Sequence, residues 1–255
     1  MESAQESRII SFGDKVLYDM CKGGLPGPNE CDKLSGQMWI IGRSYSASPE
    51  RTQGPIKSGF ANAKPTTDSS FFPEIAELIV KDDHYDKLRT LTNEAVNRVY
   101  HLDNSEDDRK LLRDTVTFVA IFNEIIKSQS KQLNENKDII RQAKNNISFS
   151  SKFLHFHLPQ LIFIIDSFSD KAARKEVTEQ IKLSKEDWGL VDAELKKDNI
   201  GDGLVYTNYA HHVWRCYSLA VRELKISKNM IPRQIDNILM GRVPLRDLSE
   251  SREIA

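Results

Sequence analysis

Hydrophobic residues recur along most of this chain at intervals of three and four, which is the spacing of one face of an α-helix. Leu34, Met38, Ile41 and Tyr45 follow the pattern i, i+4, i+7, i+11 and predict a helix over about 31–48. The same kind of pattern predicts helices over about 6–21, 70–82, 84–100, 106–131, 135–145, 149–157, 166–178, 184–197, 205–226 and 232–241. No sustained alternation of period two, Asn-Gly hairpin signal or internal repeat interrupts this pattern. The predicted fold class is therefore all-α.

The length of 255 residues is enough for one full hydrophobic core. We expect a single all-helical unit over 1–255, built as a two-lobed helical bundle. One lobe would comprise about 1–50 plus 180–255, and the other 70–178. The polar segment 50–70 is a long loop between helices, and loops of this length are usually functional or mobile.

The segment 148–166, SFSSKFLHFHLPQLIFIID, carries an unbroken apolar run of five residues, and that run ends on a carboxylate. A short helix capped by Ser148 is expected to lead through a turn into this run, which stops at Asp166. A carboxylate beside an apolar wall loses water, so its pKa tends to rise and it becomes a candidate general base. The alternative interpretation is that Asp166 only caps the next helix.

Composition restricts the class of protein. With 39% apolar and 29% charged residues the chain is typical of a soluble globular protein, and no window approaches the roughly 20 apolar residues of a membrane span. The N-terminus has no apolar signal segment. Three cysteines without CxxC spacing favour a reducing, cytoplasmic location and argue against a metal site. No phosphate-binding or dinucleotide motif is present, so no cofactor is expected.

Charge is spread unevenly although the net charge is only −1. Residues 74–108 hold ten acids and four bases, whereas residues 141–175 hold six bases and two acids. This asymmetry permits a nucleic-acid surface on one side of the molecule. A solvated helix face would look the same in the sequence.

The segment around Asp166 resembles the helix-hairpin-helix DNA glycosylases, in particular the branch that excises 8-oxoguanine. In an ungapped comparison Phe153-Leu154 fall on a Phe-Leu pair of that family, and Ile164-Ile165-Asp166 fall on its apolar-apolar-Asp end. The match covers about 20 residues. The resemblance implies a helix-hairpin-helix-like element, double-stranded DNA as the partner, and Asp166 as the catalytic carboxylate.

The chain departs from this family at two positions. The hairpin, which is usually rich in glycine, here reads NNISF over 145–149. Ser148 stands where the family carries the lysine that forms a Schiff base, so the expected enzyme is monofunctional. Lys152 lies one helical turn further on and could replace that amine, although an exposed lysine is the simpler expectation. The residues expected to contact DNA are Asn146, Ser150, Lys171 and Arg174.

Other side chains are candidates for the substrate pocket, together with Ser148 and Lys152. Trp39 and Arg43 share one helix face, where an aromatic ring could stack on a base and a guanidinium could meet a base edge or phosphate. Tyr209 and His212 share a face of the helix over 205–226. The alternative for the first pair is a core tryptophan with an ion-paired arginine, and amphipathic core packing explains the second pair equally well. His155 and His157 point to different sides of their helix, so one should be buried and the other exposed.

The interpretation that absorbs most of these features is a monomeric, monofunctional DNA glycosylase that hydrolyses the bond between deoxyribose and a flipped base. The long loop and the N-terminal helices would suit a bulky modified base, such as a hypermodified phage cytosine, and hence an antiviral role. Two other interpretations stay open. One is a non-catalytic helical protein that binds DNA or serves as a defence-associated interaction protein. The other is a protein–protein adaptor that uses the acidic 74–108 face.

Overall fold

The computed structural model describes residues 12–45, 47, 49, 70–96, 105–136, 145–176, 203–220 and 231–241. Within these residues the chain forms nine helices and no strand, which confirms the predicted all-α fold class. The helices are α2 (Phe12–Cys21), α3 (Cys31–Ser44), α4 (Phe71–Ile79), α5 (Asp83–Val96), α6 (Ser105–Asn136), α7 (Ile147–His157), α8 (Ser167–Glu176), α10 (Gly203–Ser218) and α11 (Ile231–Leu239).

The observed boundaries lie close to the predicted ones wherever the structure describes the chain. The long helix α6 runs five residues beyond its predicted end at residue 131. The loop expected over 50–70 and the helix expected over 184–197 lie outside the described residues, apart from Ser70. Residues 137–144 also lie outside them, so the helix expected over 135–145 is seen only where α6 covers it. The helix-hairpin-helix element and the two-lobed division stay predictions.

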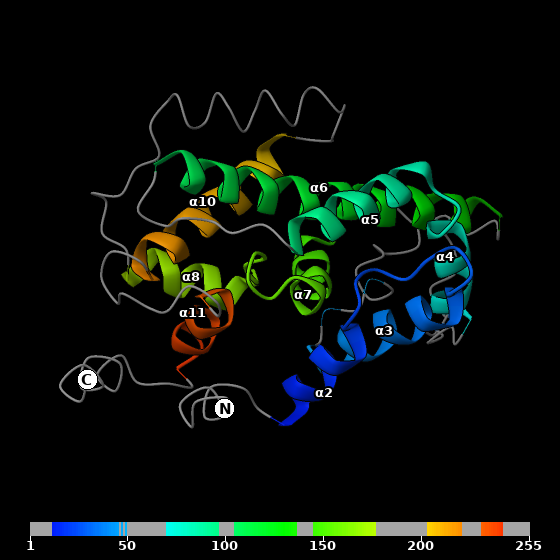
Figure 1. The fold of residues 1–255 in the computed structure, drawn as a ribbon, viewed down its shortest axis with the longest axis horizontal. Coiled ribbons are helices and arrows are strands. Elements are labelled where there is room, and N and C mark those ends of the chain that lie inside the picture. The colour runs from blue at the N-terminus through cyan, green and yellow to red at the C-terminus, as the bar shows by residue number, and fades with distance from the viewer. Residues whose placement is uncertain are drawn as a thin grey trace, which may run out of the picture.

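Helix α7 lies at the centre of the molecule (Figure 1), where it contacts α2, α3 and α6. Every side chain from Phe149 to His157 is buried, so only the first two residues of this helix are partly exposed. The longest helix, α6, also contacts α4, α5 and α10. Helix α8 contacts α10 and α11. Helices that precede α7 in the chain and helices that follow it therefore pack around α6 and α7.

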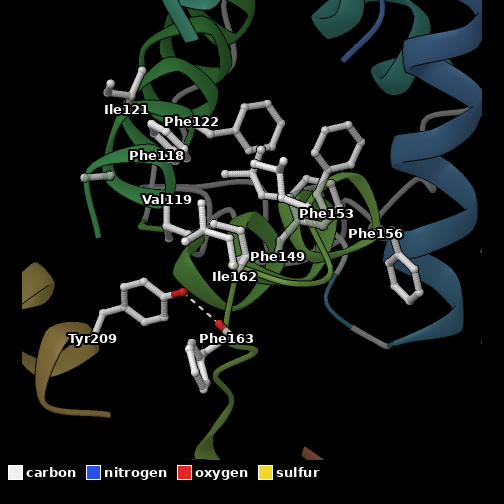
Figure 2. Packing of buried hydrophobic residues seen from close by; sticks show 14 of the residues in the cluster. Phe118, Val119, Ile121, Phe122, Phe149, Phe153, Phe156, Ile162, Phe163 and Tyr209 are labelled. Carbon is white, nitrogen blue, oxygen red and sulfur yellow. Dashed lines mark hydrogen bonds between the residues drawn. The ribbon is translucent and has the colours of Figure 1, made fainter. Parts of the chain in front are cut away.

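The phenylalanines of α6 and α7 form the middle of the core. The rings of Phe122 and Phe153 are stacked with their centroids 4.7 Å apart, and Phe149 stacks on Phe153 at 5.9 Å. Figure 2 shows these rings between the two helices, with Ile162 of the following segment nearby. Full burial of each such ring contributes about 2 kcal/mol. This packing fixes the position of α7, and with it the polar side chains that α7 carries.

A buried ionic cluster joins the N-terminal helices to α11. The guanidinium of Arg233 pairs with Asp14 of α2 and, at 2.8 Å, with Asp236 of its own helix. Tyr45, at the end of α3, donates its O–H to Asp14 Oδ1 over 2.6 Å. Arg233 is fully buried. A buried guanidinium is tolerated only with such partners, so these contacts hold α2, α3 and α11 in register.

Candidate active site

The irregular segment Leu161–Asp166, which follows the turn after α7, is held in place by side chains from neighbouring helices. It belongs to no helix or sheet, so its buried backbone groups need partners elsewhere. Four successive carbonyl oxygens each accept one side-chain hydrogen bond. Leu161 O accepts from Thr115 Oγ1, Ile162 O from His155 Nδ1, Phe163 O from Tyr209 Oη and Ile164 O from His212 Nε2, over 2.7–2.9 Å. Figure 2 shows the bond from Tyr209.

The next backbone group continues this set of bonds. The N–H of Ile165 donates to Ser151 Oγ of α7 at 3.2 Å. Helices α6, α7 and α10 therefore all position the apolar run, which we call the clamped segment (Leu161–Asp166). Its last residue is Asp166, whose place is set by contacts to three different helices rather than by a flexible loop.

Asp166 caps helix α8 with one of its carboxylate oxygens. Oδ1 accepts hydrogen bonds from the backbone N–H of Ser169 at 2.8 Å and of Phe168 at 3.1 Å. The N–H of Asp166 in turn donates to Ser169 Oγ at 3.0 Å. Reciprocal bonds of this kind satisfy the first turn of a helix. The helix-cap interpretation of Asp166 therefore describes one of its two oxygens.

The other oxygen of Asp166 is paired with Lys152. The distance from Lys152 Nζ to Asp166 Oδ2 is 3.1 Å, and Nζ also donates to Ser148 Oγ at 3.3 Å. The ammonium lies 5.8 Å from the centre of the Tyr45 ring. The Lys152 side chain is 5% exposed and that of Asp166 is 26% exposed. The expectation of an exposed lysine was therefore wrong, because the core position of α7 leaves this side chain no path to solvent.

The pKa of Asp166 is lowered, whereas the sequence favoured a raised one. Burial alone would raise the pKa of this carboxyl, but the backbone N–H of Ser169 and the charge of Lys152 outweigh it. Asp166 is therefore held as a carboxylate. Such a group stabilises positive charge well and is a weak base.

A second carboxylate, Asp170, lies one turn further along α8 and faces α10. It pairs with Arg174 at 2.8 Å and with His212 Nδ1 at 3.4 Å, and Arg215 lies 3.8 Å away. Burial alone would raise the pKa of Asp170, but His212 and Arg174 hold it below its usual value. For His212, burial works against protonation, and the contacts with Cys216 and Asp170 nevertheless raise its pKa to about 10. His212 thus donates from Nε2 to Ile164 O, and its Nδ1 faces Asp170 as the cation of an ion pair.

Two histidines of α7 are buried as neutral rings, so the expectation that one would be exposed was wrong. Burial lowers the pKa of both His155 and His157 to about 3. His155 donates from Nδ1 to Ile162 O and accepts from Tyr18 Oη at 2.7 Å. His157 is bonded to Gly24 O at 3.1 Å. Both sides of α7 are covered by other helices, which is why the two-residue spacing did not separate them.

The candidate substrate residues fall into three groups. Ser148 and Lys152 lie beside Asp166. Ser148 is the second residue of α7 rather than its cap, since Asn146 occupies the N-cap position. Tyr209 and His212 are fully buried and hold the clamped segment, so they support the carboxylate instead of lining a pocket. Trp39 is 51% exposed and Arg43 is half-buried, both on α3.

The candidate DNA-binding residues fall into a buried pair and an exposed pair. Asn146 and Ser150 are buried at the start of α7, so their side chains do not face a DNA surface in this conformation. Lys171 and Arg174 are exposed on α8. Arg174 donates a hydrogen bond from Nε to Asp170 Oδ2.

Several residues of the site were not singled out in the sequence. Thr115 and Ser151 clamp the segment, Tyr45 covers the ammonium, and Ser169 completes the cap. Only Ser169 had a visible signal, because a serine three residues after an aspartate at a helix start fits a reciprocal cap. Ser151 lies in the segment 148–166 itself, and Tyr45 and Thr115 come from parts of the chain distant in sequence.

Within the described part of the chain, no group of three or more His, Cys, Asp or Glu side chains is arranged to hold a metal ion. None of the described helices combines the length and hydrophobicity that a bilayer span requires. Comparisons with protein families, with curated proteins and with solved structures give no match to this chain.

Proposed function

We propose that this protein is a monofunctional DNA glycosylase in which Asp166 is the catalytic carboxylate. The observation that carries the proposal is an ionised, partly exposed carboxylate fixed at the end of a clamped segment and backed by a buried ammonium. Pre-oriented charge of this kind is what an enzyme uses to stabilise charge that develops in a transition state. The resemblance of residues 148–166 to DNA glycosylases supplies the reaction class.

The chemistry follows from the reacting groups. A base inside a duplex must first be flipped out, at a cost of a few kcal/mol. As the bond from C1′ to the base nitrogen breaks, the base leaves with the electron pair and positive charge builds on the sugar. Asp166 stabilises that charge and orients the attacking water, whose oxygen bonds to C1′. The water releases one proton to solvent, and the departing base takes one up.

Lys152 supports a hydrolytic reaction rather than a lyase reaction. A Schiff base requires a neutral amine with access to C1′. Here Nζ donates to Asp166 and Ser148 and is almost fully covered. Lys152 is thus placed to keep Asp166 anionic. Trapping with borohydride should give no covalent protein–DNA adduct; an adduct that Lys152→Met abolishes would contradict the monofunctional assignment.

The substrate we propose is a damaged or modified base, with a hypermodified phage cytosine, such as glucosylated hydroxymethylcytosine, as the first candidate. The test incubates the protein with duplexes carrying oxidised, alkylated or glucosylated bases and measures alkali-sensitive strand breaks. Asp166→Asn alone leaves Lys152 without its carboxylate, so the informative variant is Asp166→Asn with Lys152→Met, which removes both charges together. It should fold and release no base. Asp19→Asn, the same change at an exposed aspartate of α2, should leave release unaltered.

A second candidate function, a non-catalytic helical DNA-binding protein, is favoured by one specific observation. Both oxygens of Asp166 already have protein partners, one set in the cap of α8 and the other in the Lys152 pair. A purely structural aspartate would have the same contacts. If every DNA of the panel stays intact while salt-dependent binding is measured, this function replaces the glycosylase.

A further inference from the structure

Phe168 is the most exposed of the large hydrophobic side chains in the described part of the chain. It is 59% exposed, compared with 51% for Trp39 and 49% for Val16 and Val96. Single exposed apolar residues are common, so exposure alone means little. The position of Phe168 makes it informative. Its backbone N–H donates to Asp166 Oδ1, which ties the residue directly to the candidate carboxylate.

Phe168 is the first residue of a stripe along the exposed side of α8 that continues with two lysines. Lys171 and Lys175 follow it at i+3 and i+7, which places all three on one helix face, and both lysines are exposed. We call Phe168, Lys171 and Lys175 the α8 face.

Asp170, the acid in the first turn of the same helix, is turned away from this face. Asp170 is bound by His212 and Arg174 and lies 3.8 Å from Arg215 on α10. Ser169 and Ala173, on the packed side, are fully buried. The α8 face therefore presents an aromatic ring and two ammonium groups to solvent, while Asp170 is neutralised by its neighbours.

An aromatic ring next to spaced lysines suits a nucleic-acid strand. Bases stack on exposed rings whatever their sequence, and ammonium groups neutralise phosphates. Phe168 and Lys175 are about 10 Å apart along the helix axis, at a rise of about 1.5 Å per residue. This is about three base steps of roughly 3.4 Å.

We propose that the α8 face is where the DNA strand docks, and that Phe168 stacks into the space left beside the nucleotide on which Asp166 acts. Apolar side chains fill such spaces in other DNA complexes that unstack a base step. The inference rests on the proposed function for its substrate class. It adds a residue that holds the opened duplex and a direction for the strand along α8.

The experiment measures binding of a fluorescein-labelled 20-base-pair duplex by anisotropy at several salt concentrations. One duplex contains a tetrahydrofuran abasic analogue at its centre, and the other is fully matched. Phe168→Ala should weaken binding to the abasic duplex by roughly 5- to 100-fold, the range for loss of one stacked base. The loss on the matched duplex should be smaller, and Phe168→Trp should restore binding.

The contributions of the lysines and of the Phe168 ring to DNA binding should differ in how they depend on salt concentration. Lys171→Ala and Lys175→Ala should each lower the slope of log K against log salt by about 0.9, whereas Phe168→Ala should leave it unaltered. Val96→Ala is the matched control, because Val96 is also an exposed apolar residue but lies on α5. Circular dichroism spectra should be the same for all four variants.

The experiments can contradict the DNA-binding role of the α8 face and the glycosylase activity independently of each other. If the wild type releases base but Phe168→Ala binds both duplexes like the wild type, the α8 face is wrong and the glycosylase survives. If no base is released but the ring and slope effects appear, the α8 face stands and the glycosylase is wrong. If the wild type binds no DNA, or instead captures only an acidic peptide such as poly-glutamate, the inference is overturned.

Discussion

At the scale of single residues, the two oxygens of Asp166 have different tasks. Oδ1 holds the first turn of α8 and Oδ2 holds the ammonium of Lys152. The cap and the ion pair both help to position the carboxylate, and together they hold it ionised. Asp166 was expected to be either a helix cap or a catalytic carboxylate; it forms the cap with one oxygen, and the catalytic role of the carboxylate stays a proposal.

The first prediction concerns this pair. Lys152→Met and Asp166→Asn should each lower the free energy of unfolding by about 1–3 kcal/mol, less than for a fully buried pair because Asp166 is partly exposed. The double variant should be more stable than the sum of the two changes implies, since no charge is then left without a partner. Urea denaturation of the four proteins measures the coupling. Strictly additive effects would mean that the pair contributes nothing.

At the scale of elements, the clamped segment is the unusual part of the fold. An irregular stretch in a helical core has no neighbouring strand, and side chains from α6, α7 and α10 take over its hydrogen bonds. Polar residues that the helical pattern places in the core, Thr115, His155, Tyr209 and His212, are there for this reason. They turn an apolar run into a rigid support for Asp166.

The second prediction removes one of these bonds. Tyr209→Phe leaves Phe163 O without its donor and should cost about 1–3 kcal/mol of stability. It should also slow base release, because the carboxylate loses part of its fixed position. Tyr85→Phe is the control, since the Tyr85 hydroxyl also donates to a buried carbonyl, Pro26 O at 3.2 Å, in another part of the structure. Equal losses of activity in both variants would show a general stability effect.

At the scale of the whole molecule, buried titratable groups set how stability depends on pH. His155 and His157 are neutral in the folded state and would take up protons on unfolding below pH 6.5, until pH reaches their folded pKa of about 3. Stability therefore falls as pH drops from 6.5. His212 has the opposite sign: its pKa of about 10 means that its contribution is complete below pH 6.5 and is lost as pH rises from 6.5 to 10.

The third prediction is a stability maximum near pH 6–7. From pH 7 to pH 5, each of the two neutral histidines should cost about 2 kcal/mol, at roughly 1.4 kcal/mol per unit of pH below 6.5. Urea midpoints measured in steps from pH 4 to pH 9 test this directly. His212→Asn should flatten the alkaline side only. A midpoint that does not change between pH 7 and pH 5 would contradict the neutral burial of His155 and His157.

The sequence by itself determined the helices, because the spacing of hydrophobic residues is a local property that each helix must satisfy to bury one face. It also located Asp166 and the basic character of α8, since both follow from residues that are neighbours in the chain. Tertiary structure alone decided the surroundings of Asp166. Lys152 is covered because α7 is enclosed on all sides, and Tyr45, Thr115 and Tyr209 arrive from helices more than 40 residues away. The Ser169 N–H that helps to lower the pKa of Asp166 is a neighbour in the chain, but the Lys152 charge reaches the carboxylate only through that packing.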